Sequence, residues 1–106
     1  MLRSYQIRIL TELTIYGENM STENKLFENA VTAAKSLPEK PDDSTLLELY
    51  ALYKQGSGGD VSGDKPGFFD FVGAAKYEAR EKLRGTSEED AQSRYIELIR
   101  KLGGEF

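Results

Sequence analysis

Proline and glycine divide this chain into four pieces, and this division limits the available folds more than any other feature of the sequence. Pro38 and Pro41 form the first break, the glycine-rich stretch QGSGGDVSGDKPG at 55–67 the second, and Gly85 the third. Proline and glycine disfavour helix interiors, while the pieces between the breaks carry apolar residues at helical spacing. The sequence therefore predicts an all-α protein with four helices, joined by one long and two short connections.

Each piece also shows the signals that mark the ends of a helix. The expected helices cover about 21–37, 43–56, 71–84 and 87–102, and the last of them follows a capping-box sequence, TSEE. Helical spacing predicts one apolar stripe along each helix. The stripes consist of Leu26, Ala30, Ala33, Ala34 and Leu37; Leu46, Leu49, Tyr50 and Tyr53; Phe71, Ala75, Ala79 and Leu83; and Ala91, Tyr95, Leu98, Ile99 and Leu102. Together they predict one shared core.

The lengths of the connections limit how the helices run. Short connections between the first and second helices, and between the third and fourth, favour antiparallel neighbours. The stretch 55–67 could span roughly 40 Å when extended, whereas a helix of about 14 residues is roughly 21 Å long. The long connection can therefore return along a helix, which allows the second and third helices to run parallel.

Residues 1–20 are predicted to be an N-terminal extension of uncertain structure, and residues 21–106 to be the folded domain. Met20 opens MSTENKLFENA, which would serve as an alternative start. The apolar residues of the extension fit both the alternation of a strand and the spacing of a helix. Its two acidic residues, Glu12 and Glu18, argue against a targeting peptide.

The composition argues against several classes of function. The chain has no cysteine and no histidine, so disulfides, thiolate chemistry and the commonest metal ligand are absent, and we expect no metal site and no enzyme. A net charge of −4 argues against nucleic acid as a partner. No apolar run approaches the length of about 18 residues that a transmembrane helix needs. We expect a cytoplasmic protein.

The stretch LLELYALYKQ at 46–55 combines an apolar stripe with polar groups. Tyr50, Tyr53 and Lys54 lie three and four residues apart, so they share one helical face. Tyrosine and lysine at the edge of a core bury their apolar bodies and extend their polar ends to water, which is the simplest explanation. The alternative is a binding face for an amphiphile with a phosphorylated head, because lysine and tyrosine donate hydrogen bonds to phosphate.

Two further patterns are better explained by structure than by chemistry. Gly58 and Gly63 have the spacing of a P-loop, but Asp64 and Lys65 follow where a P-loop has Lys and Ser or Thr, and no strand precedes them. The acidic run at 88–90 lies in the predicted first turn of a helix, where carboxylates favour the helix dipole. We interpret the first pattern as a connecting loop and the second as a helix cap.

Three motifs follow one another along the chain: LYALYKQ at 49–55, KPGFFDFVGAAKYEA at 65–79 and LRGTSEEDAQSRYIELI at 83–99. Together they resemble the acyl-CoA-binding protein family, also called diazepam-binding inhibitor. The resemblance extends from about Leu26 to Leu102. It implies a four-helix bundle with up-down-down-up topology, which agrees with parallel second and third helices.

The resemblance also implies a set of ligand contacts. These are Tyr50, Tyr53, Lys54, Lys76, Tyr95 and Lys35, with Ala30, Val31 and Leu47 as weaker pocket candidates. Tyr50, Lys54 and Lys76 match residues that hold the adenosine 3′-phosphate and adenine region of coenzyme A. Two positions depart from the family pattern, because Tyr77 replaces a common tryptophan and Arg80 replaces another common aromatic residue.

The function implied is that of a noncatalytic carrier, which transports or buffers medium- to long-chain acyl-CoA esters inside the cell. Its expected partners are acyl-CoA esters and enzymes that use them, without nucleic acid, and it needs no cofactor. We expect a monomer. The alternative hypothesis is a helical module that binds a protein through the same aromatic groove.

Overall fold

A computed structural model describes residues 22–106. They form the helices α2 (Thr22–Ala33), α3 (Asp43–Gly58), α4 (Phe71–Glu81) and α5 (Glu88–Lys101), with a short 3-10 helix, η2 (Ala34–Ser36), after α2. The all-α prediction is confirmed, since no strand occurs between residues 22 and 106. The predictions for the extension and the domain boundary lie outside the described residues.

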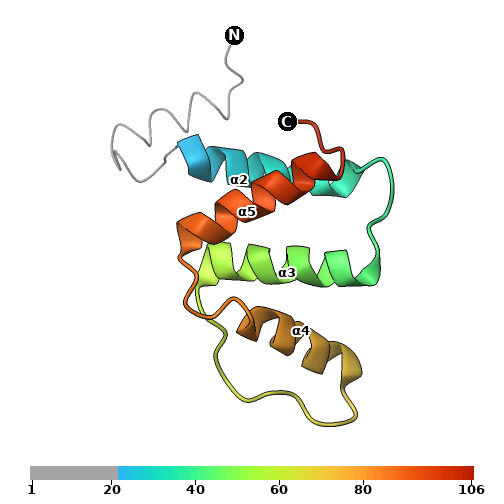
Figure 1. Ribbon diagram of the computed structural model, residues 1–106, viewed down its shortest axis with the longest axis vertical. Coiled ribbons are helices and arrows are strands. Elements are labelled where there is room, and N and C mark those ends of the chain that lie inside the picture. The colour runs from blue at the N-terminus through green and yellow to red at the C-terminus, as the bar shows by residue number, and fades with distance from the viewer. Residues whose placement is uncertain (1–21) are drawn as a thin grey trace.

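The helices follow the up-down-down-up order (Figure 1). α2 and α5 run in one direction, whereas α3 and α4 run in the other and are joined by the long loop. α5 packs against both α2 and α3, while α4 packs mainly against α3. The parallel arrangement of α3 and α4 is therefore as predicted, and α4 lies at the edge of the bundle.

The core forms where α2, α3 and α5 meet. Its buried side chains are Phe27, Ala30, Leu49, Ala51, Leu52, Leu83, Ala91, Tyr95, Ile96 and Ile99. Ala30, Ala91 and Ile99 are completely buried, and the small alanines let the helices approach closely. Most of the predicted stripe positions are buried or half-buried, but four core residues were not predicted: Phe27, Ala51, Leu52 and Ile96.

Acidic residues and serine cap the last three helices. The Asp42 carboxylate accepts a hydrogen bond from the Thr45 amide at 2.8 Å, and Asp70 accepts one from Gly73 at 2.9 Å. Ser87 accepts from the Asp90 amide at 3.0 Å, so α5 begins one residue later than a cap at Thr86 would place it. Each cap satisfies an amide that has no partner within its helix.

Two predictions for the third helix are wrong. α4 ends at Glu81 instead of Arg84, because the chain tightens into a turn in which the Leu83 amide donates to the Arg80 carbonyl at 3.0 Å. This turn reaches Gly85, whose φ of 88° is accessible to glycine at little cost. Phe71 does not join the core, since its side chain is 71% exposed at the first position of α4.

The long loop is fixed at both ends by polar contacts. Near α3, the buried Gln55 amide donates to the Asp60 carboxylate at 2.8 Å and to the Thr86 carbonyl at 2.7 Å. Near α4, Lys65 pairs with Glu78. These contacts hold the loop against the bundle and position the beginning of α4.

The two residues that depart from the family pattern also contact the loop. The Tyr77 hydroxyl donates to the Gly63 carbonyl at 3.0 Å, and the Arg80 guanidinium donates to the Gly59 carbonyl at 3.4 Å. Both substitutions therefore place a hydrogen-bond donor where the loop passes α4.

Candidate functional site

A first hollow of about 320 Å³ lies between α2, α3 and α5. Its lining consists of Val31, Ala34, Leu37, Pro41, Leu46, Leu49, Tyr50, Tyr53 and Tyr95. Three tyrosines from two different helices therefore border the same space. Aromatic rings and aliphatic side chains in this combination suit a flat, amphipathic group that can stack on a ring and accept a hydrogen bond from a phenol.

Three aromatic residues pack together beside this hollow. The Phe27 ring lies edge-on to Tyr95, with centroids 5.4 Å apart, and stacks on Tyr53 at 6.0 Å. The Tyr53 and Tyr95 centroids are 6.4 Å apart. Phe27 thus fixes the position of both phenol rings. Phe27 lies three residues before Ala30, which belongs to the predicted stripe, so helical spacing could have identified Phe27 as well.

Tyr53 and Tyr95 differ in their exposure to water. Tyr95 is 5% exposed, whereas Tyr53 is 38% exposed at the rim. Burial raises the pKa of the Tyr95 phenol, because the phenolate would lose its hydration, and the nearby Tyr53 adds to this effect. Tyr95 therefore stays a neutral hydrogen-bond donor across the physiological range of pH.

A second hollow of about 400 Å³ lies between α3 and α4. It is lined by Asp43, Leu46, Leu47, Tyr50, Phe71, Val72, Ala75 and Lys76. Its wall is made mainly of aliphatic and phenyl groups, with the charged residues Asp43 and Lys76 among them. This composition suits an alkyl chain whose polar end remains near water.

Tyr50 lines both hollows. The ammonium groups of two lysines lie beside its ring. The Lys76 ammonium lies 5.1 Å from the centroid of the Tyr50 ring, and the Lys54 ammonium lies 5.9 Å from it. Neither lysine forms an ion pair with a carboxylate of residues 22–106. Both charges are consequently available to an anionic ligand at the junction of the hollows.

Most of the predicted site residues come together around this junction. Tyr50, Tyr53, Tyr95 and Val31 line the first hollow, Leu47 and Lys76 line the second with Tyr50, and Lys54 lies beside Tyr50. Lys35 is exposed on η2 and lines neither hollow. Ala30 also lines neither, because it is completely buried in the core.

Many of the residues that line the two hollows were not predicted as site residues from the sequence. The additional residues are Ala34, Leu37, Pro41, Leu46 and Leu49 in the first hollow, and Asp43, Leu46, Phe71, Val72 and Ala75 in the second. Several had been assigned to helical stripes, which do not distinguish a core from a pocket wall. Phe71 and Val72 could have been found only from the way α4 lies along α3.

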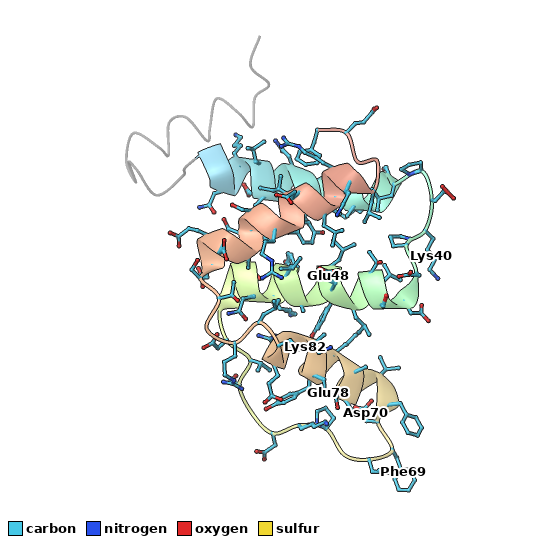
Figure 2. The ribbon with its side chains drawn as sticks, in the orientation of Figure 1. Lys40, Glu48, Phe69, Asp70, Glu78 and Lys82 are labelled. Carbon is cyan, nitrogen blue, oxygen red and sulfur yellow. The ribbon has the colours of Figure 1, made fainter. Side chains whose placement is uncertain are left out.

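A third hollow, of about 520 Å³, lies on the other side of α4 and has a different character. Its wall includes Glu48 from α3, Glu78 from α4, Lys82 directly after α4, and Arg94 from α5. Figure 2 labels the first three of these side chains. Charges of both signs make this space unsuitable for an alkyl chain.

Residues 22–106 contain neither a cluster of metal ligands nor a helix suited to span a membrane. Within residues 22–106, no group of three or more acidic residues is arranged to hold a metal ion. No helix between Thr22 and Phe106 is both long enough and apolar enough to cross a membrane.

Comparisons with known proteins agree on one family. A family model described as "Acyl CoA binding protein" matches residues 24–99. The acyl-CoA-binding protein of Saccharomyces cerevisiae is 48% identical over 79 residues, which cover 74% of this chain and 91% of the yeast protein. Acyl-CoA-binding protein homolog 1 of Caenorhabditis elegans is 43% identical over 76 residues, covering 72% of this chain and 88% of the relative.

Solved structures give the same result. Acyl-CoA-binding protein 2 of Oryza sativa matches with a TM-score of 0.72 at 34% identity, covering 76% of this chain and 89% of the rice protein. The yeast acyl coenzyme A binding protein matches with a TM-score of 0.59 at 49% identity, covering 73% of this chain and 90% of the yeast chain. The resemblance seen in three sequence motifs is confirmed over the whole bundle, and the chain belongs to the acyl-CoA-binding protein family.

Proposed function

We propose that this protein binds medium- to long-chain acyl-CoA esters reversibly and carries or buffers them without changing them. The observation that carries this proposal is the junction at Tyr50. The apolar second hollow and the aromatic first hollow both have this residue in their walls. Two lysines that pair with no carboxylate among residues 22–106 lie next to it. An acyl-CoA ester has the same three parts: an alkyl chain, an aromatic base and phosphates.

The second hollow is the proposed site of the acyl chain. Leu46, Leu47 and Phe71 provide apolar surface along α3 and the beginning of α4. Each methylene group that leaves water contributes about 0.8 kcal/mol, or roughly fourfold in affinity. Affinity should therefore increase with chain length until the hollow is filled.

The first hollow and the junction are the proposed site of the coenzyme A head. The rings of Tyr53 and Tyr50 offer surfaces on which adenine can stack, and the buried Tyr95 adds a neutral phenol. We infer that Lys54 and Lys76 donate to the 3′-phosphate, because their ammonium groups lie beside the Tyr50 ring. Lys35 stays a prediction: its exposed ammonium on η2 would approach the head group from outside the hollow.

Several features support binding without catalysis. The chain contains no histidine or cysteine, the residues most suited to act as general base or nucleophile on a thioester near neutral pH. The groups that surround the junction are phenols and ammonium groups, which hold and orient an anion. We propose that the thioester is sheltered and released intact.

Isothermal titration calorimetry with free coenzyme A and a series of acyl-CoA esters tests this function. We expect weak binding of coenzyme A alone, and an increase of roughly fourfold for each added methylene until a plateau. Chromatography of the ligand after incubation should recover the ester unhydrolysed. If long-chain esters do not bind the folded protein at micromolar concentration, the carrier function is rejected. A protein module that uses the same groove would then be the hypothesis to test.

A further inference from the structure

A cluster of exposed apolar side chains lies at the far end of the molecule from the core. Phe68, Phe69, Phe71 and Val72 are 81%, 88%, 71% and 67% exposed, and we refer to them as the Phe68–Val72 patch. Phe69 projects at the end of the molecule opposite α2 and the C-terminus (Figure 2). Large hydrophobic residues this exposed and this close together mark a surface that binds something.

The patch lies on a turn whose backbone forms internal hydrogen bonds. The Phe68 ring packs edge-on against Phe69 and Phe71, with centroids 5.3 and 6.3 Å apart. Beneath the rings, the Asp70 amide donates to the Gly67 carbonyl at 3.0 Å, and the Asp70 carboxylate accepts from Gly73 at 2.9 Å. Because the turn satisfies these polar groups internally, the rings can leave water without removing hydrogen bonds from the backbone.

The patch continues into the second hollow. Phe71 and Val72 belong to both, with part of each side chain lining the hollow and much of its surface exposed. A layer of apolar groups that covered the patch would therefore lie against the entrance to the space proposed for the acyl chain. This continuity indicates a partner that itself contains alkyl chains.

The charges around the patch have both signs. Lys65, on one side, is paired with Glu78, Asp70 is the cap of α4, and Lys76 lines the second hollow beside Val72. The whole chain carries a net charge of −4, which disfavours a strongly anionic surface. A neutral or zwitterionic surface is the better match, with affinity that depends on insertion of the rings.

We propose that the Phe68–Val72 patch inserts into the outer layer of a zwitterionic phospholipid bilayer and places the entrance of the second hollow at the lipid surface. The use of this contact for acyl-CoA transfer rests on the proposed function, although the contact itself does not. Side chains of phenylalanine are well suited to shallow insertion of this kind, because they add apolar area without a charge.

A second copy of the chain fits the Phe68–Val72 patch less well than a bilayer does. Three rings exposed to this extent, at roughly 150–250 Å² each, offer at most roughly 600 Å² per copy. A stable protein interface buries about 800 Å² on each partner. The patch is therefore too small for a stable dimer.

Single tryptophan reporters test the contact directly, since the chain has no tryptophan of its own. Phe69→Trp places the reporter in the patch, and Phe106→Trp places a matched reporter at the opposite end of the molecule. With small phosphatidylcholine vesicles, we expect a blue shift at position 69 and quenching by lipids brominated on the acyl chain, and neither effect at position 106. No change at position 69, or equal changes at both positions, overturns the proposal.

A pair of matched variants measures the contribution of the rings. Phe68→Ser with Phe69→Ser should lower the vesicle partition coefficient on the order of tenfold for each ring removed, while Phe106→Ser should leave it unchanged. Urea denaturation of the same proteins checks that they remain folded. Vesicle binding unaffected by the double substitution overturns the proposal, as does binding that requires added phosphatidylserine.

The same variants separate this inference from the proposed function. Phe68 and Phe69 line neither hollow, so the double variant should bind acyl-CoA in vesicle-free solution with unchanged affinity. Its uptake of acyl-CoA from vesicles should be slowed. Loss of vesicle binding with normal solution affinity supports the proposed contact, whereas normal vesicle binding by a protein that never binds acyl-CoA leaves the contact in place and rejects the carrier function.

Discussion

α4 has 11 residues and α5 has 14, and both carry charged and apolar side chains, yet they occupy opposite environments. α5 buries Ala91, Gln92, Tyr95, Ile96 and Ile99 between α2 and α3, whereas α4 buries none of its residues. α4 instead turns Phe71, Val72 and Ala75 toward a hollow. The difference shows that one helix of this bundle mainly stabilises the fold, while the other mainly forms a binding surface.

This division has a physical basis. A side chain packed on all sides contributes its full transfer and dispersion energy to folding. The same side chain beside a hollow contributes that energy only when a ligand covers it. The apolar residues of α4 are therefore the ones whose energy is available for binding. The following substitutions can break or sharpen this contrast.

The largest effect is expected at the centre of α5. Ile99→Ala should lower the free energy of unfolding by about 2 to 5 kcal/mol, because Ile99 is completely buried and a cavity would remain. Val72→Ala on α4, where the side chain is 67% exposed, should change it by no more than about 0.5 kcal/mol. Urea denaturation measures both. Equal losses would show that α4 supports the fold as much as α5 does.

Removal of a charged side chain on α4 should have the opposite effect, weakening ligand binding while leaving stability nearly unchanged. Lys76→Met is expected to weaken acyl-CoA binding by about 1 to 2 kcal/mol, or roughly fivefold to thirtyfold, since it removes an exposed ammonium group that we propose donates to the phosphate. Stability should hardly change. Calorimetric titration gives the affinity, and Lys82→Met is the matched control because Lys82 directly follows the last residue of α4 and lines the third hollow. If both variants weaken binding equally, the effect belongs to net charge instead of the junction at Tyr50.

A buried polar contact between α3 and α5 should have an effect of similar size, but on stability. The Gln92 amide donates to the Gly56 carbonyl at 2.8 Å, and both residues are buried. Gln92→Met keeps the length of the side chain but leaves this carbonyl without its donor, which should cost about 1 to 3 kcal/mol of stability. Ser93→Ala, at an exposed position on the same helix, should cost less than about 0.5 kcal/mol. Indistinguishable melting curves for the two variants would contradict a structural role for this contact.

The smallest effect is expected on stability at acidic pH, through Asp60 in the long loop. The Gly85 amide and the Gln55 side chain hold the pKa of Asp60 below its ordinary value of 3.8. Because the folded pKa is lower than the unfolded one, this contribution to stability is present above about pH 3.8 and is lost as the pH falls through the lower, folded value. Asp60→Asn should therefore reduce the decline in stability below pH 3.8, as measured by denaturation at a series of pH values. An unchanged acid profile would contradict this assignment.

Most of the bundle could be predicted because its signals are local. The prolines after α2, the glycine after α4 and the TSEE sequence before α5 each act within a few residues along the chain, although the cap of α5 is Ser87 instead of Thr86. The end of α4 was predicted three residues too late, since the sequence analysis treated Gly85 as the stop. The observed stop is a turn of several residues that passes through Leu83, a side chain buried in the core.

The candidate site was predicted in part, for two separate reasons. Helical spacing placed Tyr50, Tyr53 and Lys54 on one face, and the family motifs added Lys76 and Tyr95 from other helices. Most of the other residues that form the pocket walls could not be predicted from helical spacing or from the motifs. Leu46 faces both hollows and Ala30 faces neither, although both occupy stripe positions of the same kind.

The sequence by itself determined the four helices, their approximate ends and the family, because propensity, caps and motif order are properties of neighbouring residues. Only the tertiary structure decided which apolar face became core and which became pocket, since that depends on which helices pack together and how closely. Gly56 shows the reason at one residue. A Cβ atom there would lie 3.0 Å from Gln92 and 3.3 Å from Phe27, so the approach of α3 to α2 and α5 depends on a missing side chain. Exposure of Phe71 was decided in the same way, by the position of α4 on α3 alone.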